Sequence, residues 1–187
     1  PRFEPVFEIA RDRDVPISVH PGGGPWPSWV EPMRLGETSF LRTGLGFFLV
    51  DAMCIFLMIN AGVFERFPAV RFMFCQLGCG HWHFHAKRER EEAPPGQEAV
   101  WTKRELSDVL SHVWLDTHTQ DRHAVRLTID EIGAHTIVLG GDYPVSTKEQ
   151  GMLYAIAELD ALGLTPDVRR KIECDNALAL LGPRLRR

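Results

Sequence analysis

Residues 70–75 read VRFMFC, and this nearly all-apolar run decides the fold. A run of this kind fits a parallel strand that is covered on both faces better than an antiparallel strand with one face in water. Pro68 stands just before it, and a turn containing Gly78 and Gly80 follows it. We therefore predict a buried parallel strand at residues 70–75.

Three more predicted strands repeat this pattern along the chain. They lie at residues 15–20 (VPISVH), 113–116 and 136–139 (TIVL). Apolar residues at helical spacing, together with capping signals, predict helices at residues 3–14, 45–67, 101–111, 121–133, 147–162 and 165–182, and one more after Gly80. Strands that alternate with helices form a parallel sheet with right-handed crossovers.

The number of strand-helix units limits the architecture to a doubly wound sheet or a (β/α) barrel. Four units in 187 residues make half of an eight-unit barrel, which typically needs about 250 residues. A compact flavodoxin-like sheet that binds a nucleotide is disfavoured, because no glycine-rich turn opens directly into a helix. The long segment at residues 22–44, rich in glycine and proline, is expected to be a functional loop or lid.

Composition excludes several classes of protein. The chain is 44% hydrophobic and 25% charged, which is typical of a globular protein and not of a disordered one. A net charge of -4 argues against a dominant nucleic-acid-binding surface. The most apolar stretch, residues 45–61, is interrupted by Gly46, Asp51 and Asn60, and it falls short of the roughly 20 clean residues that a membrane span needs. No partner membrane or nucleic acid is expected.

Four cysteines and the first residues suggest the compartment. Three of the cysteines lie in strongly apolar runs, so all four are interpreted as buried thiols in a reducing compartment, the cytoplasm. The chain starts at Pro1 with no charged leader and apolar region behind it, so no signal peptide is expected. Cys75 and Cys79 lack a further ligand pattern, and a zinc ribbon is not indicated.

Functional residues of parallel α/β proteins lie at the carboxyl ends of the strands. Those ends hold His20, Gln76, Asp116 and Asp142 here. An imidazole and a carboxylate that converge at one barrel mouth can bind a zinc-like ion and move protons. The alternative is structural, because His20 can simply be a hydrogen-bonded strand-end residue and Asp142 can cap a loop.

Four segments, taken together, resemble a known family. They are VHPGGG, VFERFPAVRFMFCQLGCG, LGGDYP and KIECDNALALLG, which occur in this order over nearly the whole chain. In this order they resemble the amidohydrolase-2 family of metal-dependent TIM-barrel enzymes, which includes aminocarboxymuconate-semialdehyde decarboxylase and the resorcylate-type aromatic-acid decarboxylases. The resemblance implies an α/β fold of the (β/α)8 TIM-barrel type, with this chain covering about the last four β/α units.

The resemblance also implies roles for three residues. His20 matches the metal histidine of strand five, and Asp142 matches the strand-eight aspartate, a metal ligand and proton carrier. The usual form around that aspartate is G-S/T-D-Y-P, whereas this chain has GGDYP. The strand-six histidine, which polarises substrate or water, is replaced by Gln76. Glutamine neither titrates nor binds zinc well, so Gln76 is expected to orient substrate by hydrogen bonding.

The family also has an H-x-H or E-x-H pair on strand one, and no such strand precedes His20. The resemblance therefore implies that residues 1–187 are the C-terminal half of one barrel domain. A catalytic zinc commonly takes three protein ligands and a water, which one histidine and one aspartate do not supply.

Further candidates lie in the loops. Trp26 and Trp29 fall in the loop that lines the family's pocket, where they would stack on an aromatic substrate, although core packing is an equal alternative. His81, His83 and His85 either bind metal or lie on a helix surface or at an interface. The second interpretation is favoured, because on a helix only His81 and His85 share a face.

The leading hypothesis is a metal-dependent hydrolase or non-oxidative decarboxylase of a small carboxylated, aromatic or conjugated substrate. We expect a divalent metal, zinc first and manganese second, and a homo-oligomer, most simply a dimer. The alternative is a non-catalytic relative, or a half-barrel that serves as an association module. Gln76 and the missing strand-one ligands motivate that alternative, and open parallel edges would need a covering chain.

Overall fold

The structure is a computed structural model that describes residues 2–22, 40–79, 111–118, 121–143, 145 and 149–182. Its centre is a four-stranded sheet in the order β1-β2-β3-β4, and every neighbouring pair is parallel. The strands are β1 (Ile17–Val19), β2 (Phe72–Phe74), β3 (Val113–Asp116) and β4 (Ile137–Val138). All four predicted strands are confirmed, in the predicted parallel arrangement. Chain order equals spatial order, as in a (β/α) barrel.

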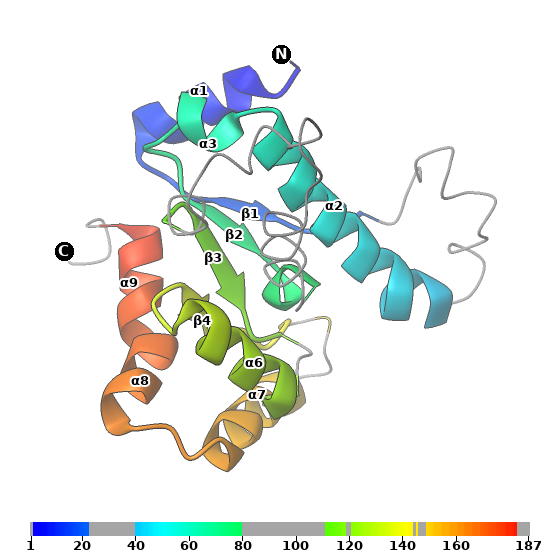
Figure 1. The fold of residues 1–187 in the computed structure, drawn as a ribbon, viewed down its shortest axis with the longest axis vertical. Helices are drawn as coiled ribbons and strands as arrows, with labels where there is room; N and C mark the ends of the chain where they lie inside the picture. Colours follow the sequence, from blue (N-terminus) through cyan, green and yellow to red (C-terminus); the bar gives the residue numbers. More distant parts are fainter. Residues whose placement is uncertain are drawn as a thin grey trace, which may run out of the picture.

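Helices gather at the two ends of this sheet (Figure 1), with α1, α2 and α3 near β1 and α6 to α9 near β4. The first group is α1 (Glu4–Arg13), η2 (Phe40–Gly46), α2 (Phe47–Asn60) and α3 (Val63–Arg66). After β2 comes the short η3 (Gln76–Cys79). The second group is α6 (Arg122–Ile132), α7 (Glu149–Ala161), α8 (Pro166–Arg170), η5 (Lys171–Asp175) and α9 (Asn176–Leu181).

One row of apolar residues runs across all four strands. Val19 pairs with Phe74, Phe74 with Leu115, and Leu115 with Ile137. Phe74, Leu115 and Ile137 are completely buried. Side chains alternate between the faces of a strand, so Cys75 and Asp116, one residue further along, point to the opposite face. The register thus directs the core to one face and polar groups to the other at the strand ends.

The helix predicted at residues 45–67 is not continuous, which corrects that expectation. It begins earlier, with wide π-helical turns in η2, and it ends at Asn60. Gly62 then adopts a left-handed conformation (φ 64°) that breaks the chain direction before α3. The buried face of α2 consists of Asp51, Ile55 and Ile59, spaced one turn apart, and α2 packs against η3.

The C-terminal helices hold β4 in place. Asp121 caps α6 by accepting hydrogen bonds from two backbone N–H groups, as a strong N-cap residue does. Thr165, where the last predicted helix begins, caps α8 by accepting a hydrogen bond from the Val168 N–H (3.4 Å). The amide of Asn176 donates to the carbonyls of Ala134 and Ile137, both at 2.6 Å. These bonds attach α9 to the strand that leads to Asp142.

Burial of the cysteines is only partly as predicted. Cys75 is buried and Cys54 is half-buried, whereas Cys174 is exposed, which contradicts the interpretation of all four as buried thiols. Cys174 lies in η5 between the charged residues Glu173 and Asp175, and the buried residue of that segment is Ile172. The side chain of Cys79 lies outside the described residues. In the described part of the chain, no helix is long and apolar enough to cross a membrane.

Candidate functional site

The four residues predicted at the strand ends all lie at the same edge of the sheet. His20 follows β1, Gln76 begins η3 after β2, Asp116 ends β3, and Asp142 follows β4. Because the strands are parallel, their carboxyl ends share one edge. The strand-end positions are therefore as predicted, although β1 and β4 are the two outer strands of the described sheet.

Two of these residues have strained backbones. Gln76 has φ 56°, and Leu77 and Gly78 continue the same left-handed turn at 55° and 58°. Asp142 has φ 55°. A non-glycine residue in this region costs on the order of 1–3 kcal/mol, and such residues cluster at active sites and ligand clamps. Asp14 also has this conformation, at φ 49°, as the C-cap of α1, so Gln76 and Asp142 are distinguished by combining it with a place at the strand ends.

Asp116 holds the strained turn in place. Its Oδ1 accepts hydrogen bonds from the backbone N–H of Gln76 (2.7 Å) and of His118 (3.1 Å). The thiol of Cys75 also donates to this carboxylate. Burial, at 8% exposure, raises the pKa of Asp116, while these hydrogen bonds and the nearby His118 oppose that rise. Asp116 is thus a buried carboxylate equipped with donors.

His118 is a site residue that the sequence analysis missed. It is 6% exposed, and its Nε2 lies 3.3 Å from Oδ2 of Asp142. The imidazole after β3 and the carboxylate after β4 therefore form a pair at the strand ends. A histidine two residues beyond a predicted strand was the available signal.

His20 is exposed and lies against Phe47 with the two rings edge to face. Its Nδ1 donates a hydrogen bond to the Pro21 carbonyl (2.8 Å). A carbonyl can only accept, so this bond places the hydrogen on Nδ1 and leaves the lone pair on Nε2. Metal-binding histidines are commonly oriented by such a bond.

Asp51 on α2 is a second buried polar residue, which the sequence analysis noted only as an interruption of an apolar stretch. It is 1% exposed, and neither carboxylate oxygen has a hydrogen-bond partner in the described part of the chain. Burial, and then the charge of Asp116, raise the pKa of Asp51 to about 8. The same two influences raise the pKa of the Cys75 thiol to about 12. The lone acid in an apolar helix was a signal in the sequence.

Two glycines after β4 allow close packing around the site. A Cβ atom on Gly140 would lie 3.0 Å from Cβ of Asp116. A Cβ on Gly141 would lie 2.9 Å from the backbone N and Cα of Met152 in α7. The departure from the usual G-S/T-D-Y-P pattern thus has a local reason, because α7 leaves no room for a side chain at position 141.

Donor chemistry at the site suits a divalent metal, but the number of donors does not complete a centre. His20 offers an imidazole nitrogen and Asp142 a carboxylate, both common ligands of zinc and similar ions. The described residues contain no group of three or more histidine, cysteine or acidic side chains placed to hold an ion. The remaining predicted residues, Trp26, Trp29, His81, His83 and His85, lie outside the described residues.

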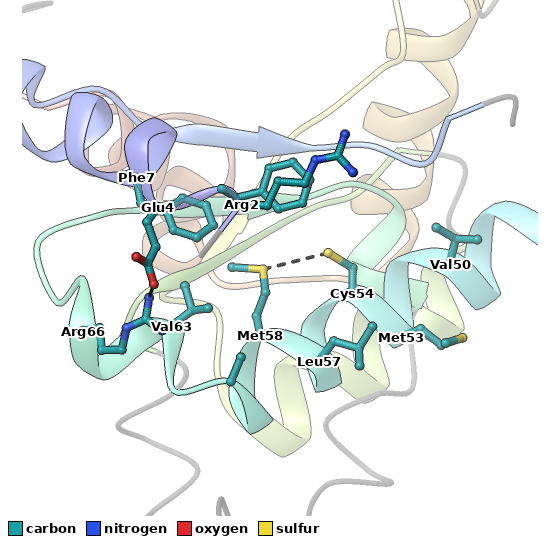
Figure 2. A pocket seen from close by; sticks show the side chains of 12 residues that line it. Arg2, Glu4, Phe7, Val50, Met53, Cys54, Leu57, Met58, Val63 and Arg66 are labelled. Carbon is teal, nitrogen blue, oxygen red and sulfur yellow. Dashed lines mark hydrogen bonds and ion pairs between the residues drawn. The ribbon is translucent and has the colours of Figure 1, made fainter. Parts of the chain in front are cut away.

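A cavity of about 450 Å³ lies elsewhere, between α1 and the helices α2 and α3. Figure 2 shows that its lining is mainly apolar, with Phe7, Met53 and Met58 among the side chains and the Glu4–Arg66 ion pair at its border. None of the strand-end residues lines this cavity. It therefore belongs to the helix layer and not to the candidate site.

Sequence comparison identifies proteins that are similar to this chain. A sequence model described as amidohydrolase matches residues 1–182. A 2-amino-3-carboxymuconate-6-semialdehyde decarboxylase from Dictyostelium discoideum is 25% identical over 155 residues, which cover 80% of this chain and 40% of that protein.

Solved structures share the fold. A 5-carboxyvanillate decarboxylase from Sphingomonas paucimobilis superposes with a TM-score of 0.78 at 22% identity, over 97% of this chain and 53% of that one. A dihydroxybenzoic acid decarboxylase from Polaromonas sp. JS666 was solved with bound manganese and the inhibitor 2-nitroresorcinol. It superposes with a TM-score of 0.74 at 23% sequence identity, over 94% of this chain and 52% of that one. These likenesses confirm the predicted TIM-barrel type of fold. The chain spans about half the length of these proteins.

Proposed function

The chain belongs to the amidohydrolase family, and from this membership we propose that residues 1–187 form the C-terminal half of one barrel domain of a metal-dependent enzyme. The proposed reaction is hydrolysis or non-oxidative decarboxylation of a small carboxylated substrate, aromatic or conjugated. The decarboxylases named above support this substrate class, since each acts on a carboxylated compound of that kind. The His118–Asp142 pair at the strand ends is the observation that carries the proposal.

We assign His20 and Asp142 as two ligands of a divalent ion, zinc or manganese. The bound manganese in the Polaromonas structure supports a divalent ion. The other ligands would come from outside the described residues. When bound, such an ion withdraws electron density from a substrate oxygen or lowers the pKa of a water. Nε2 of His20 presents its lone pair because Nδ1 is bonded to Pro21.

The residues of this chain then transfer the proton and hold the substrate. The Asp142 carboxylate carries the proton, to the substrate carbon in a decarboxylation or from water in a hydrolysis. His118 orients that carboxylate through Oδ2 and keeps it from rotating. The Gln76 side chain holds the substrate by hydrogen bonding, and its Oε1 has no partner in the described part of the chain. Trp26 and Trp29 are proposed to stack on an aromatic substrate.

Metal analysis of the full-length protein tests the assignment. Wild-type protein is expected to retain a stoichiometric divalent ion after dialysis, and His20→Ala and Asp142→Asn are each expected to lose it. Exposed His123 on α6 offers a control, since His123→Asn should retain the ion. Stoichiometric metal in both site variants would contradict the assignment. Release of CO2 from hydroxybenzoates, measured beside hydrolysis of amide and lactone substrates, distinguishes the two reactions.

We also propose that the protein works as a homodimer in the cytoplasm. Cys54, Cys75 and Cys174 are free thiols, as expected in a reducing compartment. Size-exclusion chromatography with light scattering tests the dimer, and a monomeric mass would contradict it. A protein that binds no metal and turns over no substrate would instead support the non-catalytic alternative.

A further inference from the structure

Asp51 is a buried acid that the proposed mechanism does not use. It lies on the apolar face of α2 with Ile55 and Ile59, at 1% exposure. Neither of its oxygens receives a hydrogen bond in the described part of the chain. An ionised carboxylate is strongly disfavoured in such a place, because nothing replaces the water that it has lost.

A second buried acceptor lies on the element that packs against α2. The helix α2 packs against η3, which begins at Gln76, and the charges of Asp51 and Asp116 influence each other. Gln76 is 5% exposed, and its Oε1 also lacks a donor among the residues that the structure describes. Two carboxylate oxygens on α2 and one amide oxygen on η3, the element packed against α2, are thus buried without a hydrogen-bond donor among the residues that the structure describes.

The two acids are unequally equipped for a negative charge. Asp116 receives two backbone N–H groups and a thiol, all of which stabilise its ionised form. Asp51 receives none from the residues that the structure describes. A proton shared by the two acids therefore belongs on Asp51, where it removes a buried charge and supplies the missing donor.

We propose that Asp51 and Asp116 form a carboxyl pair that holds one proton, in which neutral Asp51 lets Asp116 remain the carboxylate that positions Gln76 and His118. The pair is independent of the reaction, whereas the importance of the two positioned residues rests on the proposed function. The pKa of about 8 at Asp51 agrees with the arrangement. The other titratable groups facing the pair are Cys54 on the same helix, Cys75 after β2 and His118 after β3.

Infrared spectroscopy of the full-length protein tests the pair directly. Ordinary aspartates and glutamates are ionised at about pH 7, so a carbonyl band of a protonated carboxylic acid at that pH reports an unusual acid. We expect this band in the wild type, its loss in Asp51→Asn, and its retention in Asp130→Asn, which alters an exposed acid on α6. Absence of the band from the wild type, or its persistence in Asp51→Asn, would overturn the proposal.

Titration of the band tests the coupling of the two acids. In the wild type it is expected to disappear with a midpoint near pH 8. In Asp116→Asn the midpoint should fall, because the neighbouring negative charge that opposes ionisation of Asp51 is gone. An unchanged midpoint would show that burial acts alone and would refute the pair. The wild-type titration remains informative if a variant does not fold.

The pH dependence of the reaction rate tests whether the carboxyl pair positions Gln76 and His118. Above about pH 8 the wild-type rate should fall as Asp51 ionises beside Asp116, whereas Asp51→Asn, neutral at every pH, should keep its rate. An identical alkaline decline in both proteins would overturn the positioning role. If the full-length protein has no activity on any substrate, the proposed function fails, while the infrared result still decides the proton-holding pair.

Discussion

Nε2 of His118 lies 3.3 Å from Oδ2 of Asp142, which joins the ends of β3 and β4 through one imidazole–carboxylate contact. The contact is mostly shielded from solvent, because the His118 side chain is 8% exposed and that of Asp142 is 22% exposed. Asp142 also has a left-handed backbone, with φ 55°.

Replacing His118 by asparagine should therefore impair catalysis more than folding. Loss of a partner that orients a metal-binding or catalytic carboxylate typically costs about 10–100-fold in affinity or activity, and we expect kcat/KM to fall by that factor. Steady-state kinetics of full-length His118→Asn, beside exposed His123→Asn, provides the measurement. A kcat/KM equal to that of His123→Asn would contradict a role for the pair.

Removing Asp116 should destabilise the protein much more than removing a helix cap. Asp116→Ala leaves the buried N–H groups of Gln76 and His118 without an acceptor, at an expected cost of about 2–4 kcal/mol in unfolding free energy. The matched change Asp121→Ala also removes an acceptor of two N–H bonds, but at the exposed start of α6, where about 1 kcal/mol is expected. Urea denaturation of both variants measures the difference, and equal losses would show that burial of Asp116 does not matter.

A methyl group at position 141, next to Asp142, should destabilise the protein by colliding with the backbone of α7. Gly141→Ala would place Cβ 2.9 Å from the Met152 backbone, which cannot move without shifting α7. We expect a loss of about 1–3 kcal/mol in unfolding free energy, as for other overpacked sites. Gly22→Ala is the control, because a Cβ there meets no atom within 4 Å. Identical denaturation midpoints for the two variants would contradict the close approach of α7.

Stability should fall as pH rises, because of Asp51. Its pKa is about 8 in the folded protein and about 3.9 in an unfolded chain. Between these values the folded state binds more protons, so the unfolding free energy decreases with pH, by at most about 1.4 kcal/mol per unit from this group, and levels off above pH 8.

Asp51→Asn removes that dependence. Relative to the wild type, its unfolding temperature should rise between about pH 5 and pH 8, which thermal scans at several pH values would measure. Asp130→Asn is the control, and it should follow the wild-type curve. A constant difference between Asp51→Asn and wild type across this range would mean that Asp51 is ionised throughout.

Much of the fold could be predicted from local sequence patterns. The apolar strands at 72–74 and 113–116 and the starts of the helices predicted at 121–133 and 165–182 were predictable, because burial and capping depend on nearby residues. The break at Gly62 could not be predicted, because the φ angle of a single glycine in an apolar stretch cannot be inferred from the neighbouring residues. The strand-end rule likewise located Gln76 and Asp142 without revealing their strained backbones.

The partners of the site residues were beyond such patterns. His118 and Asp142 are 24 residues apart in the chain, 142 minus 118, and meet only because β3 and β4 are neighbours. Asp51 looked like an interruption of an apolar helix, and its meaning depends on the burial that α2 undergoes against η3. Contacts between elements, which composition and spacing do not encode, decide these roles.

The shared oxygen of Asp116 has a mechanical consequence. Oδ1 accepts from both Gln76 and His118, so the segments after β2 and β3 are fastened to one atom. A shift of the Asp116 carboxylate therefore changes both hydrogen bonds at once, which couples the positions of the two segments. Any displacement of the Gln76 turn that carries Asp116 with it would thus also move the backbone of His118, whose imidazole faces Asp142.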